Sequence, residues 1–452
     1  MNSTNKMATM KMSKLIFNMS LPLMISLLVQ SLYNIVDSIF VARISESALT
    51  ATSLAYPIQL LMIAVSVGTS VGINALLSRS VGAKEYEMTA NAAATGVLLA
   101  IAGTLVFLIL GIFFPDRFAA LFTDDETIAL YCGQYLRICM IFCLGTFIST
   151  MYQRFLQSVG YTFESMLSLI AGAVTNLVLD PILIFGFLGA PALGIRGAAI
   201  ATVIGQWVSA GTAILLNRFR NPFIRVKFSG YRPDKRVFQQ IYKVGLPTIV
   251  MQAIGSVMVT AANAILMPFS PTAVAFFGVY YKLQNFLFMP MNGLGQAAIP
   301  IVGYNFGAKN PERIRQLYRN ILPIAIVFSL AATVIFLALP GPLLSLFSAS
   351  EEMLALGIPA LRIISVTFVF ASVTMVLGYS ASGMGNGVVN MLGTAIRQLI
   401  LLIPALYLFS RFFGISHAWY AFWIAETVAV VYASIATTRE LKKENIIITH
   451  KP

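Results

Sequence analysis

Charged residues are scarce in this sequence. They make up 10% of its 452 residues, whereas hydrophobic residues make up 58%; a soluble globular protein has roughly 25% charged residues. The net charge of +13 would suit a nucleic-acid-binding protein, but the basic residues lie in short loops between apolar segments and gather on no soluble face. We therefore expect an integral membrane protein that sits in a lipid bilayer and binds no nucleic acid.

Cysteine and histidine are also rare. The three cysteines fall in one apolar segment without a CxxC pair: Cys132, Cys139 and Cys143. Neither His417 nor His450 has other ligand residues beside it. A structural zinc site needs four such ligands, so we expect no metal centre and no cofactor. The first apolar segment, from about Leu15, is too long for the core of a signal peptide, so we expect no cleavable leader.

Long apolar runs recur from end to end, each able to cross a hydrocarbon core of about 30 Å. They predict twelve transmembrane helices, over residues 15–42, 50–78, 88–114, 127–151, 162–187, 196–217, 239–269, 274–300, 315–340, 355–380, 388–410 and 416–437. Most of the 30 lysines and arginines fall in loops on one side, including a loop to which we assign Arg154. Because cytoplasmic loops carry the basic excess, both termini are expected in the cytoplasm.

The two halves of the sequence repeat each other at a constant offset. "LPLMISLLVQSLYNIVDSIF" from Leu21 aligns with "LPTIVMQAIGSVMVTAANAI" from Leu246, and without a gap "VGAKEYE" at Val81 aligns with "FGAKNPE" at Phe306. Both copies begin on the predicted cytoplasmic side, so a pseudo-two-fold axis would run along the membrane normal, as in transporters built from parallel repeats. We predict an all-α membrane protein with an N-lobe (1–217), a cytoplasmic linker (218–238) and a C-lobe (239–452), each lobe a six-helix bundle.

A polar stripe interrupts the first apolar segment. Gln30, Tyr33 and Asp37 share one helical face at i, i+3 and i+7. A carboxylate at mid-bilayer costs at least ~2.5–3.5 kcal/mol, which favours a function for Asp37 over the alternative that it reaches water or pairs with Arg43. The aligned positions of the second half are apolar or small, so the scaffold itself needs no carboxylate there: Gly255, Met258 and Ala262.

A second carboxylate, Asp180, lies in "VTNLVLDPILIFGF" one turn after Asn176. Alternatively, Asp180 caps a kink at Pro181. Thr202 could add a hydroxyl from the next span. Such oxygens suit a hard cation such as Na⁺, and two nearby carboxyl groups can share a proton. We predict an ion-coupling site formed by Asp37, Asn176, Asp180 and Thr202. A substrate cavity is predicted to overlap it, lined by Gln30, Tyr33, Asp37 and Asp180.

Other unusual residues lie inside the spans. Pro22, on the same helix as Asp37, removes a backbone hydrogen bond and is a predicted hinge, with an inert bend as the alternative. Arg137 and Arg362 are repeat mates and are expected to be structural. Lys282 and Arg397 lack such counterparts. Each side chain either lines the cavity or extends its charged end toward the membrane–water interface, and the sequence favours neither alternative.

These motifs together resemble the multidrug and toxic compound extrusion (MATE) family, in its bacterial DinF-like branch. The resemblance covers essentially the whole chain and lies in "LPLMISLLVQSLYNIVDSIFVARI", "NLVLDPILIFG" and the twin "GAK" loops. It implies a monomeric antiporter of the bacterial plasma membrane, not an enzyme, that exports organic, often cationic amphipathic compounds in exchange for H⁺ or Na⁺. By motif match, the N-lobe ion and substrate site would be Gln30, Tyr33, Asp37, Asn176, Asp180 and Thr202, with Pro22 as the bending point.

One departure from the family concerns the seventh span, where some members carry an acidic residue and this chain has Gly255. No carboxylate occurs in 244–267, so we expect ion coupling in the N-lobe alone. Two rival functions remain. A flippase for lipid-linked saccharides would need a cavity rich in arginine, and only four basic residues are assigned to spans. An intramembrane enzyme would need a nucleophile, a metal pair or a GxGD motif.

Overall fold

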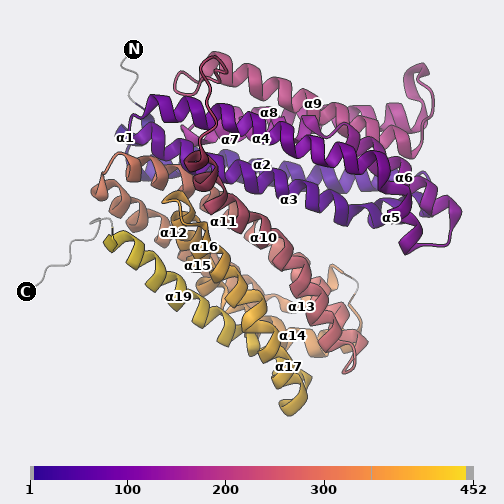
Figure 1. Cartoon of the computed structure of the whole chain (residues 1–452). Helices are drawn as coiled ribbons and strands as arrows, with labels where there is room; N and C mark the ends of the chain where they lie inside the picture. Colours follow the sequence, from indigo (N-terminus) through magenta and orange to yellow (C-terminus); the bar gives the residue numbers. More distant parts are fainter. Residues whose placement is uncertain (1–4, 348, 444–452) are drawn as a thin grey trace, which may run out of the picture.

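The computed structural model describes residues 5–347 and 349–443, and its regular elements over these residues are all helical. Figure 1 shows two bundles side by side, one from each half of the chain. The first four residues of the predicted N-lobe, and the last nine of the predicted C-lobe with His450, lie outside the described residues.

The N-lobe begins with the short helix α1 (Lys6–Thr9) and continues through α9. Its helices are α2 (Met12–Ala42), α3 (Glu46–Gly82), α4 (Tyr86–Phe113), α5 (Pro115–Phe122), α6 (Glu126–Ile141), α7 (Leu144–Ser158), α8 (Thr162–Phe185), the 3₁₀ turn η1 (Phe187–Gly189) and α9 (Ile195–Arg220). The next helix starts at Lys235. The flanking helices therefore extend into both ends of the predicted linker 218–238.

The C-lobe follows a similar order, except that α16, η2 and α17 stand where the N-lobe has the single helix α8. It comprises α10 (Lys235–Leu266), α11 (Pro271–Gly307), α12 (Pro311–Ala338), α13 (Pro340–Ser345), α14 (Glu351–Ser365), α15 (Phe368–Gly383), α16 (Gly387–Ala395), the π-helical segment η2 (Ile396–Ile400), α17 (Leu402–Phe413), α18 (Ile415–Ala418) and α19 (Ala421–Lys443).

Ten helical stretches among the described residues are long and apolar enough to cross a membrane on their own. Two more spans are bent pairs, α6 with α7 at 48° and α14 with α15 at 47°. With each pair counted once, the predicted twelve spans are present. The predicted spans 127–151 and 355–380 are each a bent pair of helices, because Phe142 and Cys143 form a turn between α6 and α7 and Val366 and Thr367 separate α14 from α15.

The sequence repeat extends to the backbone. Lys84 and Lys309, the lysines of the twin "GAK" loops, both adopt positive φ angles of 60° and 53°. Gly160 and Gly385, at the turns before α8 and α16, have φ angles of 96° and 95°. A positive φ is uncommon for a residue with a side chain, so its recurrence at aligned lysines shows that the two halves share one local fold.

Among the described residues, the backbones of the two lobes approach each other closely near one end. A Cβ added to Gly72 of α3 would lie 2.2 Å from the Ile241 carbonyl oxygen of α10, and one on Gly82 would lie 2.0 Å from that of Tyr304 in α11. Backbones can approach this closely only where residues are small. These contacts lie near the ends of the helices that face the termini, and Figure 1 shows the bundles diverging toward the opposite end.

The first long helix of each lobe, α2 or α10, also packs on the other lobe. The start of α2 is buried in one hydrophobic cluster with α11 and α12, through Met12, Leu15, Ile16, Met19 and Leu23. Conversely, Val237 and Ile241 at the start of α10 are buried in the N-lobe cluster. Pro22 is buried within the uninterrupted helix α2, at the end of the part that contacts the C-lobe.

Candidate functional site

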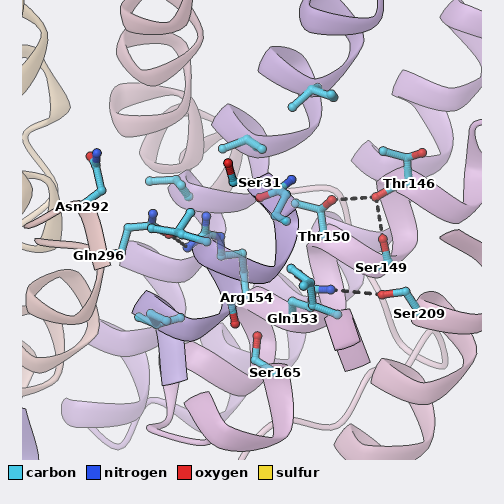
Figure 2. A pocket seen from close by; sticks show the side chains of 18 of the residues that line it. Ser31, Thr146, Ser149, Thr150, Gln153, Arg154, Ser165, Ser209, Asn292 and Gln296 are labelled. Carbon is cyan, nitrogen blue, oxygen red and sulfur yellow. Dashed lines mark hydrogen bonds between the residues drawn. The ribbon is translucent and has the colours of Figure 1, made fainter. Parts of the chain in front are cut away.

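A central cavity of about 640 Å³ lies between the lobes. Its wall comes from α2, α3, α7, α8 and α9 of the N-lobe and from α10, α11, α15 and α16 of the C-lobe. Pockets for drug-sized molecules typically measure about 300–1,000 Å³, so the cavity is large enough for one such compound. Figure 2 shows part of its wall, where side chains of both lobes point toward the same space.

The wall of the cavity is polar but nearly uncharged. Glutamines line it from five different helices: Gln30, Gln153, Gln157, Gln206, Gln252 and Gln296. Serine, threonine and asparagine supply most other polar groups, and Met251 and Met289 add flexible apolar contacts. Among the described lining residues, Arg154 alone carries a formal charge. The cavity can thus offer many hydrogen bonds to a ligand while imposing little geometric specificity.

The sequence-predicted residues divide into two groups. Gln30, Tyr33, Asn176 and Thr202 line the cavity. Asp37 and Asp180, also predicted to line it, are absent from its described wall; this part of the prediction needs correction. Asp180 is fully buried, one helical turn beyond Asn176, and the packing of α8 on α2 and α9 covers it. Asp180 therefore lies behind the wall, whereas Asp37 is half-buried.

The four predicted ion-coupling residues lie together at this wall, with Asn176 and Thr202 lining the cavity. The Asn176 side-chain nitrogen lies 3.3 Å from Asp180 Oδ1 and 3.4 Å from Thr202 Oγ1, and it donates to both. The carboxyl groups of Asp37 and Asp180 are close enough to interact directly, and Tyr33 lies within electrostatic range of both. Three buried oxygens accept no hydrogen bond from the described protein: Asp37 Oδ1, Asn176 Oδ1 and Asp180 Oδ2.

Arg154 does not lie in a cytoplasmic loop, and that assignment was wrong. It belongs to α7, is only 8% exposed, and lines the cavity. Its Nη1 donates to the side-chain oxygens of Gln157 at 2.7 Å and of Gln296 at 3.0 Å. Figure 2 shows Arg154 beside Gln296. The error arose because α6 and α7 form one long bent span, so the arginine near its end was placed outside the membrane.

A buried ion pair in the C-lobe was missed altogether. Arg397 Nε lies 3.3 Å from Glu426 Oε1, with side-chain exposures of 12% and 5%. Arg397 lies in the π-helical segment η2, and such segments often occur at functional positions. Neither residue is among the described residues that line the cavity, and the exposed Lys282 is not among them either. The overlooked signal was Glu426, a single carboxylate inside the last span.

The repeat mates Arg137 and Arg362 have local partners. Arg137 pairs with Asp116, and Arg362 Nε donates to the Leu337 carbonyl oxygen at 3.3 Å. All three cysteines are buried and free. The described residues contain no group of three or more His, Cys, Asp or Glu placed to hold a metal ion, so the candidate ion site relies on amide and hydroxyl oxygens beside its two carboxyl groups.

Comparisons with known proteins agree with this architecture. The MatE family model matches residues 22–182 and 247–408, once in each half. The multidrug export protein MepA of Staphylococcus haemolyticus (strain JCSC1435) is 26% identical over 424 residues, 93% of this chain and 92% of MepA.

Solved structures share the fold. A MATE crystallised in complex with MaL6 has a TM-score of 0.89 at 22% identity, covering 99% of this chain and 100% of that one. The outward-facing conformation of a multidrug resistance MATE family transporter has a TM-score of 0.88 at 23% identity, covering 99% of both chains. Since the family model matches both repeats and most of the sequence, the chain belongs to the MatE family, whose members are transporters and not enzymes.

Proposed function

We propose that this transporter is a multidrug efflux antiporter, which exports amphipathic organic compounds in exchange for H⁺ or Na⁺. Support for the export of varied compounds comes from its similarity to MepA, a multidrug export protein, and from the drug-sized cavity with its adaptable wall. The resemblance to the family implies cationic compounds, and this part of the proposal rests on the resemblance alone.

One observation carries the proposed ion coupling. Three buried oxygens of Asp37, Asn176 and Asp180 accept no hydrogen bond from the described protein, although buried polar atoms are nearly always satisfied. A proton shared by the carboxyl groups, or a Na⁺ ion held by carboxylate and amide oxygens, would satisfy them. Asn176, Tyr33 and Thr202 also line the cavity, which would let the ion influence substrate binding.

The transport cycle would alternate the access of the cavity between the two sides. With both termini in the cytoplasm of a bacterium, as predicted, the divergent end of Figure 1 faces outward. An ion can shift the balance between outward-open and inward-open states only if it binds them differently. Pro22 is a suitable hinge, because it lies between the C-lobe-packed part of α2 and the part that bears Asp37. The working unit would be a monomer, since the described cavity is complete within one chain.

Replacement of Asp37 or Asp180 by asparagine tests the proposal. Purified variants in proteoliposomes should lose the acceleration of dye efflux by an imposed H⁺ or Na⁺ gradient, because an amide cannot exchange a proton and has no charge to hold Na⁺. Dye binding in detergent should persist. Asp124→Asn is the matched control, since Asp124 is exposed in a loop.

Undiminished gradient-driven efflux in both Asp37→Asn and Asp180→Asn would refute coupling at this site. If neither gradient accelerates efflux in the unmodified protein, the antiport itself is wrong. A flippase remains the alternative; it would move a fluorescent lipid-linked saccharide between leaflets without either gradient. The described cavity has a single arginine, whereas a diphosphate-linked lipid would call for several.

A further inference from the structure

We propose that Arg154 binds an acidic group of the transported compound, so that the substrates include amphiphiles bearing a carboxylate, sulfonate or phosphate. This inference rests on the proposed function of the same cavity and adds the chemical class of its ligands. It differs from the expectation of cationic compounds, because the charge that faces the cavity is positive.

The first argument is that Arg154 has no counterion. A buried charge is normally paired, because removing it from water is costly. Its hydrogen-bond partners among the described residues are two neutral amide oxygens, on Gln157 and Gln296. Among the described residues, none of the ion pairs within 4.0 Å involves Arg154. The cavity thus holds a guanidinium whose charge the surrounding protein leaves unneutralised.

The second argument concerns its free hydrogen-bond donors. A guanidinium has five N–H groups in a planar fork that matches a carboxylate or phosphate with two parallel bonds. Both hydrogen bonds of Arg154 come from Nη1. Nε and Nη2 donate to no described residue and are not among the fully buried unsatisfied atoms, so they remain accessible to a ligand in the cavity.

The third argument is that the carboxyl pair lies too far away to neutralise Arg154. Gln157, the neighbour of Arg154, donates to Ser165 Oγ at 2.8 Å, whereas Asp180 is bonded to Asn176. Ser165 and Asn176 both lie on α8, eleven residues apart, which corresponds to about 16 Å along a helix. A positive group thus marks one end of the cavity, and two carboxyl groups lie near the other. An elongated molecule with its acidic group at the Arg154 end would complement this arrangement.

Arg154 could instead serve only to join the lobes, because Gln296 belongs to the C-lobe helix α11. Loss of such a contact would change the conformational balance for every substrate alike. Recognition of an acid, in contrast, would change the selectivity between an acidic compound and its uncharged-ester counterpart. The two roles therefore predict different results for a matched pair of ligands.

The experiment uses rhodamine B, which carries a carboxylate, and its ethyl ester, which has the same ring system without the acid. Binding is measured by fluorescence anisotropy in nanodiscs of phosphatidylcholine, and export is measured in proteoliposomes. The unmodified protein should bind the acid at least about tenfold more tightly than the ester, a ratio within the range of charge-assisted hydrogen bonds. Arg154→Gln should abolish this preference, and Arg154→Lys should retain part of it.

The control is Gln296→Ala, which removes the contact between the lobes and keeps the charge. It should alter both affinities by the same factor and leave the preference intact. Equal affinities in the unmodified protein, or a preference for the acid that survives Arg154→Gln, would overturn the inference. Export of the ester would in that case leave the proposed function standing. If neither dye is bound or exported, both fall. Displacement of the acid by added phosphatidylglycerol would assign the same acid-binding chemistry to a lipid headgroup.

Discussion

An alanine in place of Gly72 should drive the protein out of the conformation described above. The new Cβ would lie 2.2 Å from the Ile241 carbonyl oxygen, whereas ordinary contact begins near 3.4 Å. The two atoms nearest to the new Cβ are the backbone carbonyl oxygen and carbon of Ile241, so no side-chain rotation relieves the clash. Helices α3 and α10 must therefore separate by about 1.2 Å at this point, at the end where the lobes touch.

The size of the effect follows from the cost of overpacking, typically ~1–3 kcal/mol. In the proposed cycle, α3 and α10 touch at this point only while the cavity is open at the far end. The cost then falls on one state and shifts the ratio of the two states by roughly 5- to 150-fold. Substrate access should move toward the side of the termini by that factor.

Thiol labelling can measure this shift. Ser31 lines the cavity, so Ser31→Cys, made after replacement of the three native cysteines, reports its accessibility to a membrane-impermeant maleimide. Gly72→Ala should slow labelling from the outer side of oriented vesicles and speed it from the inner side. Gly278→Ala is the control, since no atom lies within 4 Å of a Cβ there. Identical labelling rates in the two variants would show that the close contact does not stabilise the outward-open state.

Two further predictions concern buried groups. Glu426→Gln leaves Arg397 buried beside a neutral partner and should destabilise the protein by ~3–5 kcal/mol, whereas Arg397→Met with Glu426→Leu should cost much less. Thermal unfolding in detergent compares the two variants. An equal loss in both would contradict the reasoning that the penalty comes from a buried charge left without its partner. The native thiols of Cys132, Cys139 and Cys143 are 0%, 4% and 0% exposed, so mass spectrometry should find them unlabelled by maleimide until the protein unfolds. Rapid labelling of the folded protein would show that the helices around them separate readily.

The sequence predicted the membrane spans well because a spanning helix must be both long and apolar, and both properties are local. The constant offset of the repeat extended this success to the relation between the lobes. The same pattern contained no sign of the breaks at Phe142 and Val366, since neither break contains proline or glycine. Helix–helix packing sets such breaks, and composition does not record it.

The site was harder to predict because it depends on which face of a helix meets which neighbour. The polar stripe located Gln30, Tyr33 and Asp37 on one face, but only packing separates the two that line the cavity from the carboxylate that does not. Arg154 was misplaced because charge alone suggested water. Its partner Gln296 comes from the other lobe, 142 positions away, and no periodicity within one helix points to such a neighbour.

The exchanged first helices have a consequence for how the two halves came together. The apolar start of α2 completes the C-lobe core, and the start of α10 completes the N-lobe core. One repeat alone would leave a first helix without its cover. Two separate copies would bury both by trading these helices, as domain-swapped dimers do. The duplicated chain thus has the form of a swapped homodimer joined by residues 221–234, and co-expressed halves cut within that segment should still assemble.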